Sequence, residues 1–134
     1  ALDLFEAIQE RFHYVAIDNR DAIATIKRYG RDPRTLLYVD PPYVDAEYYY
    51  EVSKKGFPHA GVAQALAEVA CFVALSYYPH PTIDIWYHNW RCVTWQQQKS
   101  SQIQLAQREE DTATENLLCN YPDPVQSLWN DEVQ

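Results

Sequence analysis

The chain has 134 residues, of which 47% are hydrophobic and 14% aromatic, a composition typical of one folded domain and not of a disordered segment. Glycine occurs only three times, about 2% of the chain against a usual share of roughly 7%, and no GxG or GxxxxGK pattern is present, which excludes a glycine-rich phosphate or dinucleotide loop within these residues. The formal net charge of −8 disfavours a nucleic-acid binder that relies on a net basic surface of its own.

The spacing of cysteine, histidine and apolar residues excludes further classes. Cys71, Cys92 and Cys119 are odd in number and far apart, which favours free thiols in a reducing compartment and a cytoplasmic protein. The histidines lack metal-ligand spacing, so no metal site is expected. No apolar run approaches the ~20 residues of a membrane span, so no membrane partner is expected. The chain opens with Ala1 and contains no methionine, and we interpret it as an excised or partial chain.

Hydrophobic periodicity predicts helices and strands that alternate along most of the chain. Apolar residues recur every three or four positions in the helices and form short continuous runs in the strands. The elements predicted are, in chain order, a helix over 2–12, a strand over 14–17, a helix over 22–29, a strand over 35–39, a helix over 62–69, a strand over 71–75, a short helix over 83–90, and strands over about 91–96 and 115–121.

This order of elements predicts an α/β fold. Strands that are apolar throughout are expected to be covered on both faces, and their alternation with helices favours a parallel sheet with right-handed crossovers. The last two strands have no helical pattern between them and predict an antiparallel hairpin at one edge. We therefore expect a three-layer, Rossmann-like sheet of mostly parallel strands, followed by a loose tail over 122–134.

Polar residues follow three of the predicted strands. Asp18 follows 14–17, Asp40 follows 35–39, and Ser76 follows the strand that ends at Leu75. In open parallel sheets, ligands bind in the crevice beyond the carboxyl ends of the strands, so these side chains are expected to face one crevice. Polar residues also end strands without any function, and that interpretation stays open here.

The segment Asp40-Pro41-Pro42-Tyr43 predicts a small site with its own chemistry. The prolines fix the backbone in extended geometry and donate no N–H, so the turn offers mainly acceptors, the Asp40 carboxylate and the Pro41 carbonyl among them. Tyr43 adds an aromatic ring beside them. A rigid pair of acceptors next to a stacking ring suits the amino edge of a base, although an ordinary rigid loop with a packing tyrosine has the same sequence.

An aromatic amine is a poor nucleophile because its lone pair is delocalised into the ring. Two acceptors that draw its hydrogens favour a pyramidal nitrogen and localise that lone pair for in-line attack. The carboxylate of Asp40 also stabilises the positive charge that develops on the nitrogen. Stacking on Tyr43 would hold the base, with a contribution of roughly 1–3 kcal/mol.

The residues around this motif resemble the DNA adenine methylases that use S-adenosylmethionine. The resemblance covers about residues 2–121. Its segments are Val15-Ala16-Ile17-Asp18-Asn19-Arg20-Asp21-Ala22, Thr35-Leu36-Leu37-Tyr38-Val39 with Asp40-Pro41-Pro42-Tyr43, Leu75-Ser76 followed by Tyr78, and Glu115 with Asn120-Tyr121.

The resemblance implies a site-specific DNA methyltransferase that transfers a methyl group from S-adenosylmethionine to the N6 amine of adenine, as in restriction–modification. It implies that residues 1–121 are the C-terminal part of a Rossmann-like catalytic domain. The implied partners are DNA, with its target adenine flipped out of the duplex, and the missing N-terminal half of the same domain.

The resemblance also implies a role for particular residues. The residues implied to be catalytic are Asp40, Pro41, Pro42 and Tyr43. Those implied to hold the cofactor are Asp18, Asp21, Ala22 and Asp40, although Asp21 is equally compatible with a helix N-cap and Asp18 with a turn. Tyr43 is also implied to hold the substrate, and we expect the same of Ser76 from its place after a strand and of Tyr48 and Lys54 from their place beside the site. The last two belong to an aromatic and basic loop that could order over DNA, or whose tyrosines could pack on the sheet.

The chain departs from the family in two ways. The glycine-rich cofactor loop and the DNA-reading segment are absent, so we expect the chain alone to transfer little or no methyl. Tyr77 stands where the family has glycine, between Ser76 and Tyr78. Two alternatives stay open: a degenerate remnant that only binds a partner, and a methyltransferase for protein glutamine or RNA.

Overall fold

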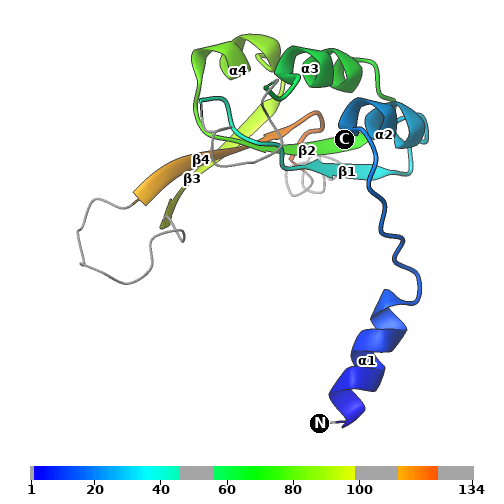
Figure 1. Cartoon of the computed structure of the whole chain (residues 1–134). Coiled ribbons are helices and arrows are strands. Elements are labelled where there is room, and N and C mark those ends of the chain that lie inside the picture. The colour runs from blue at the N-terminus through cyan, green and yellow to red at the C-terminus, as the bar shows by residue number, and fades with distance from the viewer. Residues whose placement is uncertain (1, 46–55, 99–111, 124–134) are drawn as a thin grey trace, which may run out of the picture.

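The computed structural model describes residues 2–45, 56–98 and 112–123. It confirms a mixed α/β chain whose elements follow the expected order (Figure 1). The elements are α1 (Leu2–Phe12), α2 (Ala22–Tyr29), β1 (Leu36–Val39), α3 (His59–Ala67), β2 (Phe72–Tyr77), α4 (Pro81–Trp86), β3 (Arg91–Gln98) and β4 (Thr112–Cys119). The strand expected over 14–17 is the one element that did not form.

The strands form one open sheet in the order β1-β2-β4-β3. Strand β1 pairs in parallel with β2, with Val39 opposite Leu75, whereas β4 pairs antiparallel with both β2 and β3. The expected hairpin of the last two strands is therefore confirmed, but the expectation of a mostly parallel sheet is wrong. Three strands do run the same way. The reversed strand β4 lies between β2 and β3, so only one pair of parallel neighbours remains.

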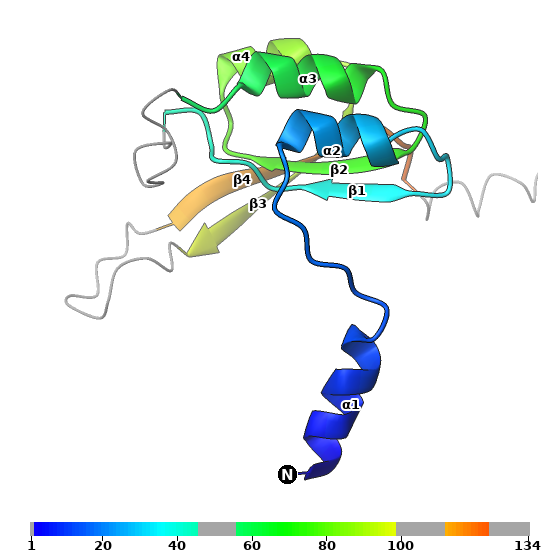
Figure 2. The same ribbon diagram turned by 45° about the vertical axis from the view of Figure 1, so that its right-hand side comes forward.

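Helices α2, α3 and α4 cover one face of this sheet (Figures 1 and 2). The core between them includes Val62 and Leu66 from α3, Val73 and Leu75 from β2, and Ile83 from α4, all almost completely buried. Burial of apolar side chains of this size stabilises a fold by about 1.5–3 kcal/mol each.

The other face of the sheet carries apolar side chains without a cover from the described residues. Leu36 and Tyr38 of β1 are 60% and 64% exposed, and Phe72 of β2 is 53% exposed. The expectation that both faces are covered is therefore wrong for this part of the chain, which forms two layers and not three. Exposed apolar surface of this kind is a common feature of interaction sites.

The segment 14–17 is an exposed linker, with Tyr14 91% and Ile17 89% exposed. It connects α2 to α1, which lies apart on the uncovered side of the sheet (Figure 2). The run has the composition of a buried strand. A strand forms only when another strand completes its hydrogen bonds, however, and none of the described strands pairs with it.

The three cysteines are free, with Cys71 and Cys119 buried and Cys92 exposed. Burial raises the pKa of the Cys71 thiol. Among the described residues, no helix is long and apolar enough to cross a membrane.

One of the scarce glycines permits a close approach between α2 and the end of α3. The Gly30 N–H donates to the Ile26 carbonyl at the end of α2, and the Gly30 carbonyl accepts from the Ala70 N–H, each over 2.8 Å. A Cβ at Gly30 would lie 2.6 Å from the Ile26 carbonyl oxygen and would collide with the side chain of Val69. The backbone here has ordinary right-handed geometry, so space alone requires glycine.

We expect Gly30→Ala to lower the free energy of unfolding by about 1–3 kcal/mol, because the added methyl group overpacks this contact. Urea denaturation would measure the change. Gln64→Ala on the exposed side of α3 is the control, with an expected change within about 0.5 kcal/mol. Equal denaturation midpoints for the two variants would contradict the requirement for glycine at position 30.

Candidate functional site

The candidate site begins where β1 ends. Asp40 directly follows Val39, the last residue of β1, and is exposed. Pro41 is buried and Pro42 half-buried, so the turn after Asp40 is held against the protein. Because neither proline has an N–H, this turn offers a carboxylate and carbonyl oxygens, as the sequence predicts.

Tyr43 is held by both ends of its side chain. Its hydroxyl donates to Oε1 of Glu115 over 2.6 Å and lies 3.2 Å from Oδ1 of Asp40. Its half-buried ring packs edge-on against Tyr78, with ring centroids 4.4 Å apart, and lies tilted against Tyr77 at 5.8 Å. Burial first, then the hydrogen bond to Glu115 and the nearby negative charges, raise the pKa of Tyr43 well above its ordinary value. Its hydroxyl therefore stays protonated and acts as a donor.

Glu115 is the residue of this site to which sequence reasoning gave no role. It lies in β4, beside Asn116, which pairs with Tyr77 of β2. The antiparallel register therefore brings an acid 72 residues further along the chain to the end of β1. The sequence does show an acid near the start of a predicted strand, which is followed by Leu117-Leu118-Cys119. It does not show which side chain that acid contacts.

A second hydrogen bond supports the ring beneath Tyr43. The buried Tyr77 hydroxyl lies 2.8 Å from Nδ1 of His59, the first residue of α3. The rings of His59 and Phe57 pack against each other at 4.9 Å. The loop that follows Asp40 is thus fixed to α3 as well as to the sheet.

Ser76 lies inside β2, not beyond its end. The pairing of Val39 with Leu75 places it level with Asp40 in the sheet register. Its side chain is buried, and its hydroxyl lies 3.0 Å from the Tyr38 hydroxyl, with which it shares a hydrogen bond. Ser76 is thus near Asp40 along the strands, but the contact that the structure shows is to Tyr38.

The residues expected to hold the cofactor lie at and before the start of α2. Asp21 is the N-cap of that helix, where its carboxylate accepts a hydrogen bond from Ala24 N–H over 2.9 Å. Ala22 is the first residue of the helix. Asp18 pairs with Arg20 in the exposed linker. Among the described residues, no contact brings Asp18 and Asp40 into the one crevice that the sequence predicts. Of the two roles open for Asp21, the structure shows the helix cap.

Two expected substrate residues, Tyr48 and Lys54, lie outside the described residues. Most of the expected tail, 124–134, also lies outside them. The division of the chain at residue 121 therefore stays a prediction.

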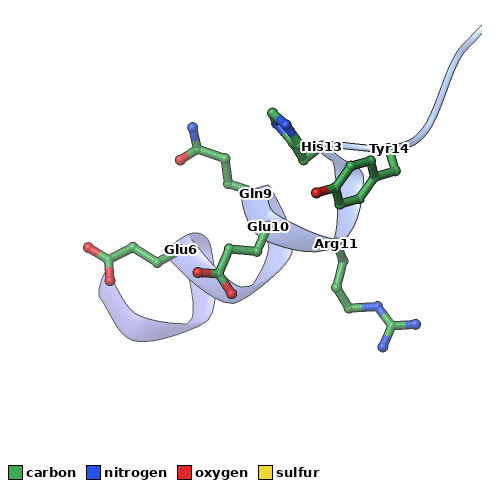
Figure 3. Close-up of a pocket in the computed structure, with 6 residues that line it drawn as sticks. All are labelled: Glu6, Gln9, Glu10, Arg11, His13 and Tyr14. Carbon is green, nitrogen blue, oxygen red and sulfur yellow. The ribbon is translucent and has the colours of Figure 1, made fainter.

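A shallow hollow lies on α1 and the two residues after it, away from Asp40. Figure 3 shows side chains that leave the helix in several directions and do not converge on one point. Glu6, Gln9, Glu10, Arg11, His13 and Tyr14 line it. All are exposed, and none was expected to have a function. This hollow has the character of a solvated helix surface.

Comparison with known proteins does not assign a family. No protein-family model and no curated protein matches the chain. The resemblance to DNA adenine methylases therefore depends on the residues quoted for it.

One of those residues, Asn120, has a structural role. Its side chain accepts a hydrogen bond from Val73 N–H over 2.8 Å and donates one to the Cys71 carbonyl over 2.9 Å. It thereby satisfies backbone groups on both sides of Phe72, where β2 begins. Such groups are costly to leave unpaired when water is excluded.

We expect Asn120→Ala to lower the free energy of unfolding by about 1–3 kcal/mol, because two backbone groups lose their partner. The denaturation midpoint in urea would report the loss. Asn89→Ala, at an exposed position after α4, provides the matched control. A midpoint for Asn120→Ala no lower than that of the control would show that the side chain does not support β2.

Proposed function

We propose that the chain is part of a DNA adenine methyltransferase in which Asp40 receives the target amine. The observation that carries this proposal is the position of Asp40, exposed at the carboxyl end of a parallel strand and followed by two fixed prolines and an anchored tyrosine. Ligands of open α/β sheets bind at such strand ends. The proposal rests equally on the resemblance in sequence.

The chemistry follows from the acceptors at the end of β1. The amine of adenine has two hydrogens. Its nitrogen becomes positively charged as it bonds to the methyl group and the methyl–sulfur bond of the donor breaks, and it becomes neutral again when one hydrogen leaves as a proton to solvent. The Asp40 carboxylate and the Pro41 carbonyl accept those hydrogens, and the carboxylate stabilises the charge. Oδ1 of Asp40 already faces the Tyr43 hydroxyl, whereas Oδ2 has no hydrogen bond within the part of the chain that the structure describes. This second oxygen is the one we assign to the amine.

Tyr43 has a different role in the structure from simple stacking. Its ring already packs on Tyr77 and Tyr78 and is only half exposed to an incoming base. We therefore propose that it forms one wall of the base site and fixes the height of the base above Asp40. Tyr48 and Lys54 remain candidates for contacts with flanking bases and phosphate. The partner is DNA with the adenine turned out of the duplex, because the amine is otherwise inaccessible.

The described residues form at most one side of a site for S-adenosylmethionine. Asp21 uses one carboxylate oxygen to cap α2 and keeps the other, and Ala22 is half-buried beside it. The hollow on α1 includes neither residue. When bound, S-adenosylmethionine supplies an electrophilic methyl group. We propose that a segment beyond the described residues completes its site.

The open surfaces of the sheet support a larger domain. The outer edge of β1 has no partner strand among the described residues, and the uncovered face carries Leu36, Tyr38 and Phe72. If residues 14–17 formed a strand in the complete domain, a right-handed crossover would put it on that same outer side of β1, because α2 and α3 cover the same face. A missing N-terminal half that supplied intervening strands and helices would produce the three-layer, Rossmann-like fold.

The same exposed surfaces favour one alternative, a remnant that folds and binds a partner without catalysis. The two functions differ in what Asp40 does, because a docking module has no use for an acceptor at the end of β1. We propose a cytoplasmic location in either case, on the strength of the three free cysteines.

The first test asks whether the chain distinguishes an amine. Single-stranded oligothymidylate carrying one central adenine is compared with the same strand carrying purine, which lacks the 6-amino group. At low salt, we expect about tenfold tighter binding of the adenine strand, since a hydrogen bond to a charged acceptor contributes roughly 1.5–3 kcal/mol. Fluorescence anisotropy measures both affinities.

Asp40→Ala is expected to reduce this preference to less than about twofold. Asp84→Ala on α4 removes the same charge at an exposed position and is expected to keep it. A wild-type chain without any preference for the amine would contradict the proposed function and favour the docking module.

The second test concerns the reaction. The chain is expressed with the residues that precede it in its gene, incubated with duplex DNA and S-adenosylmethionine, and assayed for N6-methyladenine by mass spectrometry. We expect methyl transfer, and a loss of about 10²–10³-fold in rate for Asp40→Ala, the usual effect of removing one preorganised electrostatic group. Undiminished transfer by that variant would exclude Asp40 from the mechanism.

A further inference from the structure

The Tyr43 hydroxyl has one hydrogen and two carboxylates within reach. The distance to Oε1 of Glu115 is 2.6 Å, within the range of a charge-assisted O–H···O⁻ bond, whereas the distance to Oδ1 of Asp40 is 3.2 Å, longer than O–H donors prefer. The proton is therefore shared unequally. Glu115 receives the strong hydrogen bond, and Asp40 keeps a weak one.

The ring of Tyr43 is fixed independently of this hydroxyl. Its contacts with Tyr77 and Tyr78 hold the ring, and Tyr77 is in turn bonded to His59. With the ring held, the hydroxyl oxygen stays within reach of both acids. Which of them it bonds then depends on whether Glu115 is present.

Glu115 is placed in β4 by the antiparallel pairing of Asn116 with Tyr77, and it is half-buried. A partly buried carboxylate is stabilised when a donor satisfies it. The bond to Tyr43 meets that need. Stability alone does not account for an acid at position 115, because an apolar residue there would need no hydrogen-bond donor.

We propose that Glu115 is a positioning residue that draws the Tyr43 hydroxyl away from Oδ1 of Asp40 and so keeps the negative charge of that carboxylate for the target amine at Oδ2. This inference rests on the proposed function of Asp40. Without Glu115, the Tyr43 hydroxyl has Asp40 as its only acceptor among the described contacts. A full hydrogen bond from the hydroxyl to Oδ1 would then draw negative charge from the carboxylate and weaken Oδ2 as the acceptor of the amine.

A double-mutant comparison tests this role, with the adenine and purine strands described above as probes. Glu115→Ala is expected to reduce the adenine preference at least threefold, because the freed hydroxyl bonds Oδ1 of Asp40 and draws charge from the carboxylate that holds the amine. In a Tyr43→Phe background, where no hydroxyl can do so, the same substitution is expected to change the preference less than twofold. Glu115→Gln keeps an acceptor oxygen and is expected to retain most of the preference. Glu68→Ala, an exposed acid after α3, is the matched control.

The two possible failures are distinguishable. An equal loss for Glu115→Ala with and without the Tyr43 hydroxyl would show a merely structural role and overturn the inference, as would no loss in either background. Both results would leave the proposed function intact if Asp40→Ala still removes the preference. Absence of an adenine preference in the wild-type chain would contradict the proposed function itself.

A spectroscopic measurement tests the hydrogen bond without any ligand. In protein labelled with ¹³C at the tyrosine Cζ, the resonance that disappears in Tyr43→Phe belongs to Tyr43, and the alkaline pH at which it begins to shift compares its pKa between variants. The titratable groups that face this hydroxyl or its ring are Asp40, Glu115, Tyr77 and Tyr78.

We expect Glu115→Ala to lower the pKa of Tyr43 from its raised value, since a negative acceptor is removed, while burial and Asp40 keep it above the ordinary value. Thermal melting of each variant confirms that it is folded. An unchanged pKa would show that the bond to Glu115 does not hold the hydroxyl, and would overturn the inference.

Discussion

The pairing of β2 with neighbours of opposite direction is the constraint on which the site depends. Strand β1 runs parallel to β2, so the carboxyl end of β1 lies at the carboxyl end of β2. Strand β4 runs antiparallel to β2, so its beginning lies at that same end. Asp40 follows β1 and Glu115 lies in the first half of β4, and the two acids therefore meet around one tyrosine hydroxyl. In a sheet of parallel neighbours throughout, residue 115 would lie at the opposite end from Asp40.

The features that the sequence predicted correctly are those decided locally. The periodicity of 22–29 reflects a helix that buries one stripe, and the apolar run that ends at Val39 reflects a strand under those helices. The position of Asp40 at the end of that strand can be predicted from the neighbouring residues alone. The helix cap at Asp21, one of the two roles left open for it, is also local, since a capping side chain contacts the backbone three residues later.

The features that the sequence could not predict depend on partners far along the chain. Residues 14–17 have strand composition, but composition does not supply a neighbouring strand, and the run stays exposed. The position of β4 beside β2 also depends on pairing between distant residues. The sequence predicts a hairpin of β3 and β4, but either strand of that hairpin could lie next to β2. The contact of Glu115 with Tyr43 follows from that position of β4 and from the register, so it could not be read from spacing.

The same dependence on pairing explains why the two halves of the proposed site differ. The amine half is attached to β1, β2 and β4, which complete one another's hydrogen bonds, and its side chains are held by packing and by short contacts. The proposed cofactor half is attached to the exposed linker before α2, which joins the body of the protein at the start of that helix. If the linker residues held the methyl donor as proposed, the linker would have to lie at the end of β1. Strands added at the outer edge of β1 would do this, because they would give 14–17 a place in the sheet and carry Asp18 to the same end as Asp40. Completion of the sheet and completion of the site are then one event.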